Sequence, residues 1–176
     1  MLARRPRKGV GSVREMRVMA VGVEPGTARP VLLLHEAGGG DRLLPVWIGI
    51  AEANAIAVEQ QGVSLPRPLT HQLIADVVAA FGRRLERVRI TALRDHIFYA
   101  ELILDRNTRI SARVSDAIAL ALHLGVPIHA EDTVLDVAAV THTTIPAEGA
   151  DRGQPDEVEE FRRFLDTTSP EDFDAD

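Results

Sequence analysis

Cysteine is absent from this chain of 176 residues, and so are long apolar runs. Without cysteine there can be no disulfide, no zinc site built on thiolates and no thiol nucleophile. No stretch approaches the roughly 18 consecutive apolar residues of a membrane-spanning helix, and the basic N-terminus is not followed by the apolar core of a signal peptide. We therefore expect a cytoplasmic protein with no membrane partner.

Aromatic side chains and lysine are also scarce, and charge is unevenly distributed. Phe, Trp and Tyr make up 4% of the residues, and Lys8 is the single lysine. The net charge is +5 over residues 1–17, −3 over 18–147 and −8 over 148–176, which together give the −6 of the whole chain. Because the body is slightly acidic, any contact with nucleic acid must use a local arginine patch.

Hydrophobic periodicity and turn signals divide the chain into strands and helices. The expected strands fall into two groups of three, at 15–21, 31–36 and 42–48 and at 85–93, 97–104 and 109–114, with a short seventh at 127–130. The expected helices are 51–62, 70–82, 115–125 and 132–140. Because the strands cluster and the turns within each group are short, we predict an α+β fold, with antiparallel strand groups and packed helices in a single compact domain.

Tails and a linker are expected on either side of this domain. The predicted segments are a disordered tail at 1–14, the domain at 15–142, a linker at 143–154, a helix at 155–166 and an acidic tail at 167–176. The helix at 155–166 is amphipathic, with Val158, Phe161 and Leu165 on one stripe. The apolar content of so small a body predicts a homo-oligomer, a dimer or higher.

A first candidate site lies where a strand is expected to end and an apolar helix to begin. Ser115 has the chemistry of an N-cap, and Asp116 suits the positive end of the helix macrodipole. In one interpretation, these residues serve only to start the helix, and Arg113 and Asp116 form an ion pair. Arg113 is also placed where a guanidinium and a helix N-terminus could hold a phosphate together. The sequence leaves both interpretations open.

A second candidate site is the segment Pro66–Leu73, whose two prolines present Arg67 at low entropic cost. Thr70 is expected to cap the next helix, with His71 at the border of its buried face. That face is predicted to consist of Leu73, Ile74, Val77, Val78 and Phe81, with Gln72 and Asp76 pointing away. A histidine at a helix N-terminus favours the neutral form that serves as a base or metal ligand. A half-buried histidine bonded to a loop is the alternative.

A third candidate is the start of the helix that follows Trp47, the only tryptophan. Glu52, Ile56 and Glu59 share one stripe of that helix, but the two acids lie about 10 Å apart, too far to clasp one ion together. A solvated acidic face explains this stripe as well as a site does.

Arginine is concentrated in the segment 83–94, which contains five arginines. On a strand, Arg87 and Arg89 share one face, and Arg109 and Arg113 could extend it into a basic strip that follows a phosphate backbone. Pairing with acids such as Glu101, or burial in a dimer, is the alternative.

Three stretches, taken in order, resemble the bifunctional nuclease domain family. They are "PVWIGIAEANAI", "PRPLTHQL" and "ARVSDAIALAL", and the resemblance covers roughly residues 15–140. It implies a small α+β domain, often oligomeric, with nuclease activity on RNA and DNA attributed to some members. Two positions depart from the family pattern: Val114 replaces a usual proline, and Ser111 replaces a frequent aspartate.

Two functions follow as hypotheses. In a nuclease that hydrolyses phosphodiester bonds, Arg67 and Arg113 would hold phosphate and His71 would act as base or ligand. Glu52 and Asp116 would be catalytic carboxylates that ligate Mg²⁺ or Mn²⁺. No organic cofactor is expected, since nucleotide-binding motifs are absent. The alternative is a non-catalytic regulatory or protein-interaction module of the same fold.

Overall fold

The computed structural model of the protein describes residues 12–24, 27–63 and 66–141. The predicted linker, C-terminal helix and acidic tail lie outside the described residues. The strands are β1 (Val13–Val23), β2 (Pro30–Glu36), β3 (Arg42–Trp47), β4 (Leu85–Arg94), β5 (Ile97–Leu104), β6 (Thr108–Ala112), β7 (Ile128–Glu131) and β8 (Val140–Thr141). The helices are α1 (Ile50–Gln60), α2 (Thr70–Ala80), α3 (Val114–Leu124) and α4 (Asp132–Ala138), with a 3₁₀ turn at Asp105–Asn107. The predicted α+β class is confirmed.

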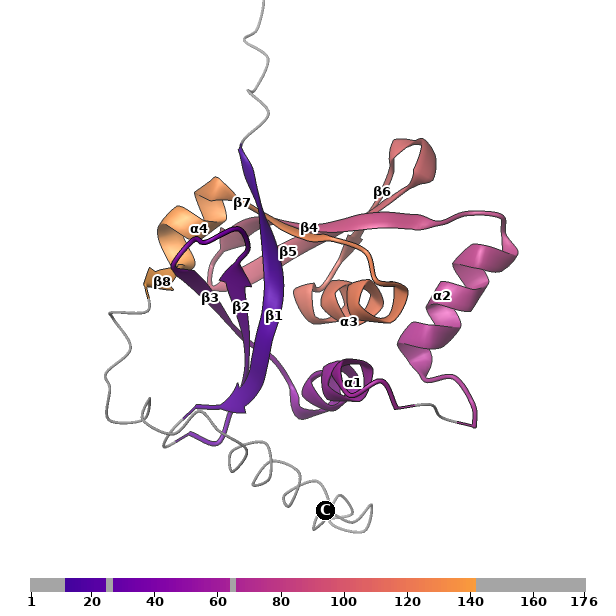
Figure 1. Ribbon diagram of the computed structural model, residues 1–176, viewed down its shortest axis with the longest axis horizontal. Coiled ribbons are helices and arrows are strands. Elements are labelled where there is room, and N and C mark those ends of the chain that lie inside the picture. Colours follow the sequence, from indigo (N-terminus) through magenta and orange to yellow (C-terminus); the bar gives the residue numbers. More distant parts are fainter. Residues whose placement is uncertain (1–11, 25–26, 64–65, 142–176) are drawn as a thin grey trace, which may run out of the picture. The chain divides into compact units, whose positions relative to one another are not determined.

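The strands form one mixed sheet in the order β6-β5-β4-β7-β1-β2-β3-β8. The two predicted antiparallel groups are present, as β1–β2–β3 and β4–β5–β6. The short strand β7 joins them, because it pairs antiparallel with β1 and parallel with β4 (Figure 1). Val13 and Arg14 already pair with β7, so β1 begins two residues before the expected strand.

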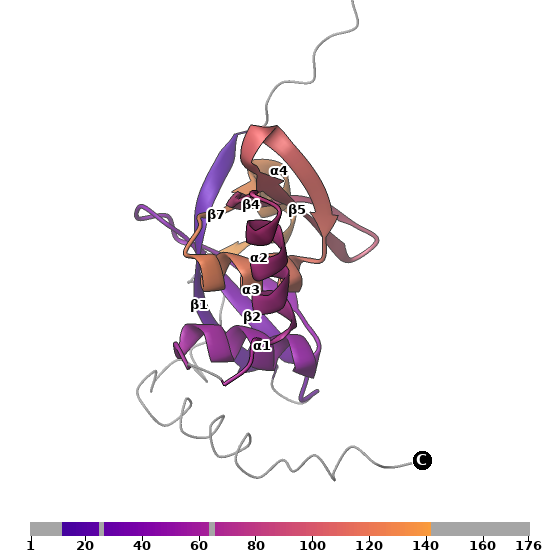
Figure 2. The same cartoon turned by 90° about the vertical axis from the view of Figure 1, so that its right-hand side faces the viewer.

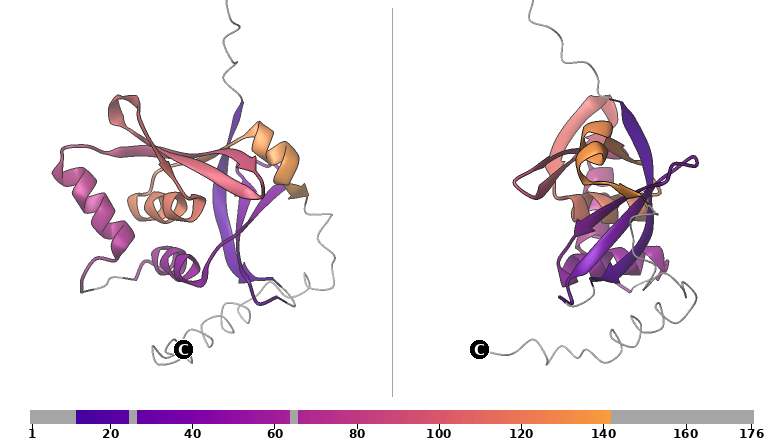
Figure 3. Two further views of the ribbon diagram at one scale, coloured as in Figure 1. Left: turned by 180° about the vertical axis from the view of Figure 1, so that it is seen from behind. Right: turned by 90° about the vertical axis from the view of Figure 1, so that its left-hand side faces the viewer.

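The helix α3 lies at the centre of this part of the chain. It packs on β4 and β5 on one side and on α1 on the other, as Figure 1 and the reverse view in Figure 3 show. Its buried residues are Val114, Ser115, Ala117, Ile118, Ala119, Leu120 and Ala121. Gly125 ends the helix in the left-handed conformation, with φ of 63°. The prediction of a central, buried helix that ends in glycine is therefore confirmed.

The helix α2 is the main departure from the predicted packing. Most of its expected buried face is exposed, although Val78 packs against the core. The exposed fraction is 52% for Leu73, 47% for Val77 and 79% for Phe81. Only Ala75 is buried. Apolar spacing identified the helix correctly. It could not show that α2 packs on α3 through only a few of its apolar side chains. None of the described helices is long and apolar enough to cross a membrane.

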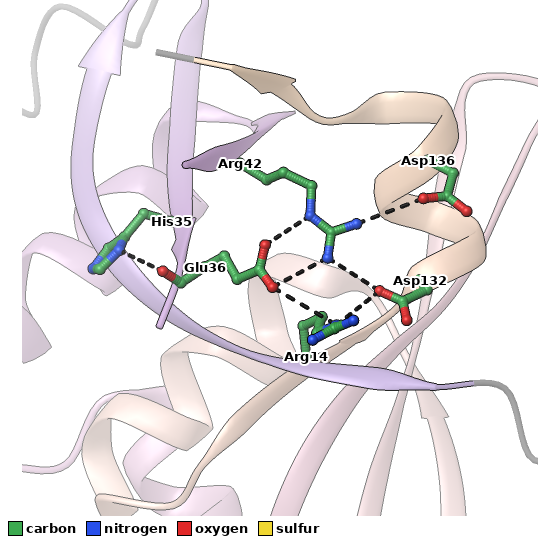
Figure 4. Close-up of polar contacts among 6 residues, drawn as sticks. All are labelled: Arg14, His35, Glu36, Arg42, Asp132 and Asp136. Carbon is green, nitrogen blue, oxygen red and sulfur yellow. Dashed lines mark hydrogen bonds and ion pairs between the residues drawn. The ribbon is translucent and has the colours of Figure 1, made fainter. Parts of the chain in front are cut away.

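A network of ion pairs ties β1 and the β2–β3 hairpin to α4 (Figure 4). Arg42 donates to Glu36 from Nε at 2.7 Å and from Nη2 at 3.1 Å, and Nη2 is also 3.1 Å from Oδ1 of Asp132. Arg14 adds a bond of 3.1 Å to Asp132. These side chains hold the start of α4 against the sheet.

Candidate functional site

The first turns of three helices meet at one place, and each supplies one polar side chain. Glu52 is in the first turn of α1, His71 in that of α2 and Asp116 in that of α3. The N-cap residue of α3, Arg113, connects them. We call Glu52, His71, Arg113 and Asp116 the helix-start cluster. Figure 2 shows α2 crossing in front of α1 and α3.

Arg113 bridges the two acids of the cluster. Its Nε lies 2.8 Å from Oδ2 of Asp116, its Nη2 lies 3.0 Å from Oδ1, and its Nη1 lies 2.7 Å from Oε1 of Glu52. The bond to Asp116, followed by that to Glu52, raises the pKa of Arg113 above its ordinary value. The side chain of Arg113 is nevertheless 67% exposed, so its remaining N–H donors face solvent.

His71 and Asp116 form a histidine–carboxylate pair, with Nε2 of His71 3.1 Å from Oδ1 of Asp116. Burial opposes ionisation of Asp116, but hydrogen bonds from Arg113 and His71 outweigh it and hold the pKa of this carboxyl below its ordinary value. Asp116 is therefore an anion that only accepts, so Nε2 of His71 carries the proton. In the neutral ring, Nδ1 is then the free proton acceptor.

The helix starts add positive potential to the cluster. Neither α1 nor α3 has a side-chain hydrogen bond at its N-cap, and the N-terminal ends of helices carry partial positive charge. At the start of α1, a Cβ on Gly49 would meet the carboxylate of Glu52, which would have to shift from its present position. Gly49 thus lets Glu52 lie over the helix start and face Arg113.

The two predicted hydroxyl caps are not formed. Ser115 is the second residue of α3 and is 8% exposed, while Arg113 occupies the N-cap. Thr70 is the first residue of α2, whose N-cap is Leu69. There the Leu69 N–H donates to Oε1 of Gln72 at 2.9 Å. In α3, the helix begins one residue earlier than predicted, because Val114 before the serine also joins it. In α2, the helix begins at Thr70 as predicted, but Thr70 is its first residue and Leu69 is the N-cap.

The other predicted cations lie outside the helix-start cluster. Arg67 is exposed and makes no hydrogen bond or ion pair with another described residue. Arg89 and Arg109 share the face predicted for them, but both pair with Glu101, at 3.2 and 3.6 Å. The alternative of pairing with acids therefore accounts for much of the predicted strip.

The acids of the helix-start cluster are bonded to an arginine and are not arranged around a metal position. The expected ligands Glu52 and Asp116 both accept hydrogen bonds from Arg113, which lies between them. No three His, Asp or Glu side chains in residues 12–24, 27–63 and 66–141 are grouped so that they could hold an ion. As arranged, these residues do not fit Mg²⁺ or Mn²⁺.

A second polar group, missed from the sequence, lies along the same helices. Oε1 of Glu59 accepts from Nε2 of Gln72 at 3.0 Å, and Oε2 lies 3.1 Å from Nδ1 of His123. Glu59 follows Glu52 by seven residues, and His123 follows Asp116 by seven. Such spacing, two helical turns, puts both members on one face of a helix. That shared spacing was the signal in the sequence that could have identified the group.

Comparisons with known protein sequences identify the family of this chain. The sequence model of the bifunctional nuclease domain matches residues 31–143, more than half of the chain. An uncharacterized protein of Mycobacterium tuberculosis is 53% identical over 165 residues, which cover 92% of this chain and 98% of the mycobacterial protein. Bifunctional nuclease 2 of Arabidopsis thaliana is 31% identical over 104 residues, 56% of this chain but 31% of the plant protein. This chain belongs to the bifunctional nuclease domain family.

Proposed function

We propose that this chain is a nuclease that hydrolyses phosphodiester bonds in RNA, DNA or both, at the helix-start cluster. The observation that carries the proposal is the His71–Asp116 pair beside the exposed guanidinium of Arg113. The names of the plant relatives, which describe them as bifunctional nucleases, support the same chemistry.

The proposed reaction uses Nδ1 of His71 as the general base. It takes a proton from water, or from a ribose 2′-hydroxyl, as that oxygen attacks phosphorus and the bond to the leaving oxygen breaks. Asp116 orients the ring and stabilises the imidazolium, which then returns the proton to the leaving oxygen. Glu52 holds the guanidinium of Arg113 in place.

Phosphate binding is assigned to arginine and to the helix starts. The free N–H donors of Arg113 can bond to phosphate oxygens while its other donors stay on Glu52 and Asp116. The positive ends of α1 and α3 favour an anion at the same place. Arg67 precedes α2 on an exposed segment, and we propose that it contacts a neighbouring phosphate.

The alternative function is a non-catalytic regulatory or protein-interaction module. The exposed apolar side chains of α2, such as Leu73 and Val77, favour it because apolar patches often mark protein contacts. In such a module, the helix-start cluster would only fasten three helices together.

A nuclease time course separates the two functions. In His71→Asn and Asp116→Asn, we expect cleavage of single-stranded RNA and DNA to fall about a hundredfold or more, the usual scale for a lost acid–base group. Asp76→Asn is the matched control, because Asp76 is exposed on α2 and has no polar partner among the described residues. It should keep the wild-type rate.

Each protein is assayed with and without EDTA. Cleavage that persists in EDTA and disappears in the two cluster variants supports the metal-independent reaction. If EDTA abolishes it, Mg²⁺ or Mn²⁺ takes part, and the arrangement around Arg113 must change on binding. Equal cleavage in the variants and the control would overturn the proposed site.

A further inference from the structure

The position of α2 depends on polar contacts, because its apolar side chains contribute little to packing. Ala75 is buried and Val78 is partly buried against the core, while Leu73, Ile74 and Val77 are at least 40% exposed. A helix fastened in this way has no broad apolar interface to fix its position. The hydrogen bonds of its first turn therefore decide where His71 lies.

Two polar contacts hold that first turn. His71 is bonded to Asp116 on α3, and Gln72 donates to Glu59 on α1 at 3.0 Å. The other end of the Gln72 side chain accepts the N–H of Leu69. Gln72 thus connects the start of α2 to α1.

Glu59 is itself held by a second histidine. Nδ1 of His123 lies 3.1 Å from Oε2, and the Glu59 side chain is only 10% exposed. A carboxylate so enclosed needs donors on both oxygens, and Gln72 and His123 supply them. The chain of hydrogen bonds therefore leads from His123 in the last turn of α3, through Glu59 near the end of α1, to Gln72 in the first turn of α2.

We propose that Glu59 and His123 are positioning residues, which act through Gln72 to fix the first turn of α2 and so hold His71 against Asp116. The catalytic part of this inference rests on the proposed function. The placement of α2 does not, and it is measured separately.

An exchange of charge between two side chains tests the contact. Gln72→Glu alone puts two carboxylates against each other, while it still offers an acceptor to the Leu69 N–H. Adding Glu59→Gln restores one donor and one acceptor in reversed order. We expect amide hydrogen exchange over 70–80 to become about tenfold faster in the single variant and to return toward the wild-type rate in the double variant.

A second pair of variants tests His123. His123→Asn keeps a nitrogen donor near the position of Nδ1, and His123→Ala removes it. We expect faster exchange over 70–80 in the alanine variant and wild-type exchange in the asparagine variant. Unchanged exchange in both His123→Ala and Gln72→Glu would overturn the inference.

The effect on catalysis is measured by determining kcat and KM separately for each variant. Displacement of His71 should lower kcat about tenfold with little change in KM, because Arg113 is not moved. The Gln72→Glu, Glu59→Gln double variant should regain kcat. Altered exchange with unchanged kcat would show that α2 is positioned by this contact but that His71 is not the base, which overturns the catalytic part alone. If the wild type has no nuclease activity, the proposed function fails, and the exchange data still decide the positioning.

Discussion

Arg42 and Arg113 are among the arginines that bridge pairs of acids, and their exposure separates their roles. Arg42 bonds to Glu36 and Asp132 with a side chain that is 23% exposed. Arg113 bonds to Glu52 and Asp116 but is 67% exposed. An enclosed guanidinium has no room for a ligand, so Arg42 stabilises the fold. The open guanidinium of Arg113 keeps exposed donors, as the proposed phosphate contact requires.

Removal of Arg42 should therefore destabilise the protein strongly. Arg42→Ala leaves the Glu36 carboxylate, which is 11% exposed, without its main donor. Hydrogen bonds to charged groups contribute about 1.5–3 kcal/mol, and we expect a loss of that size in the free energy of unfolding measured with urea at pH 7. Arg42→Lys keeps the charge but loses the bidentate geometry. Its free energy of unfolding should therefore lie between those of the wild type and Arg42→Ala. A loss below that of an exposed control such as Arg84→Ala would contradict this role.

The same contact predicts how stability depends on pH. Hydrogen bonds from Arg42, partly opposed by burial, hold the pKa of Glu36 below its ordinary value. A carboxyl whose pKa is lowered by folding binds fewer protons in the native state, so its contribution is complete above the unfolded pKa of about 4.3 and is lost as the pH falls through the folded pKa. The free energy of unfolding of the wild type should therefore fall below about pH 5. In Glu36→Gln, it should fall less steeply over the same pH range.

At the scale of elements, the sequence predicted which helices and strands exist better than what they bury. The apolar run after Asp116 is nearly continuous, so α3 had to be central whatever its neighbours. The stripe Leu73–Phe81 has the same spacing as a core-facing helix, yet most of it faces solvent. Periodicity reports that one face is apolar, but it does not report what covers it. All four members of the helix-start cluster were named as candidates from the sequence, whereas the contact between Glu59 and His123 needed the positions of the helices.

Substitutions on α2 and α3 should measure this difference. Ile118 is fully buried, and Ile118→Ala should cost about 2–5 kcal/mol of unfolding free energy. Phe81 is 79% exposed, and Phe81→Ser should change it by no more than about 0.5 kcal/mol. Chemical denaturation at low protein concentration makes the comparison. A large cost at Phe81 that grows with protein concentration would place this side chain in an interface of the homo-oligomer, which stays a prediction from the sequence.

At the scale of the whole described region, β7 unites strand groups that the sequence presents as separate. It has four residues, and Ala130 within it is fully buried. The residues "PIHA" do not predict a position between β1 and β4. Strand order depends on the path of the chain after α3, not on local residue spacing. Since both groups share this strand and one apolar core, they should unfold together.

The single tryptophan and the single tyrosine allow this to be tested without labels. Trp47 lies in β3, in the first strand group, and Tyr99 lies in β5, in the second. We expect their fluorescence to change at the same urea concentration, and at the midpoint given by far-UV circular dichroism. Ala130→Pro removes an N–H donor from a central strand and should separate the two midpoints or prevent folding. Separate Trp47 and Tyr99 transitions in the wild type would mean that β7 does not couple the two strand groups. The helix-start cluster, which α1 and α3 bring together from the two halves of the chain, could then open without global unfolding.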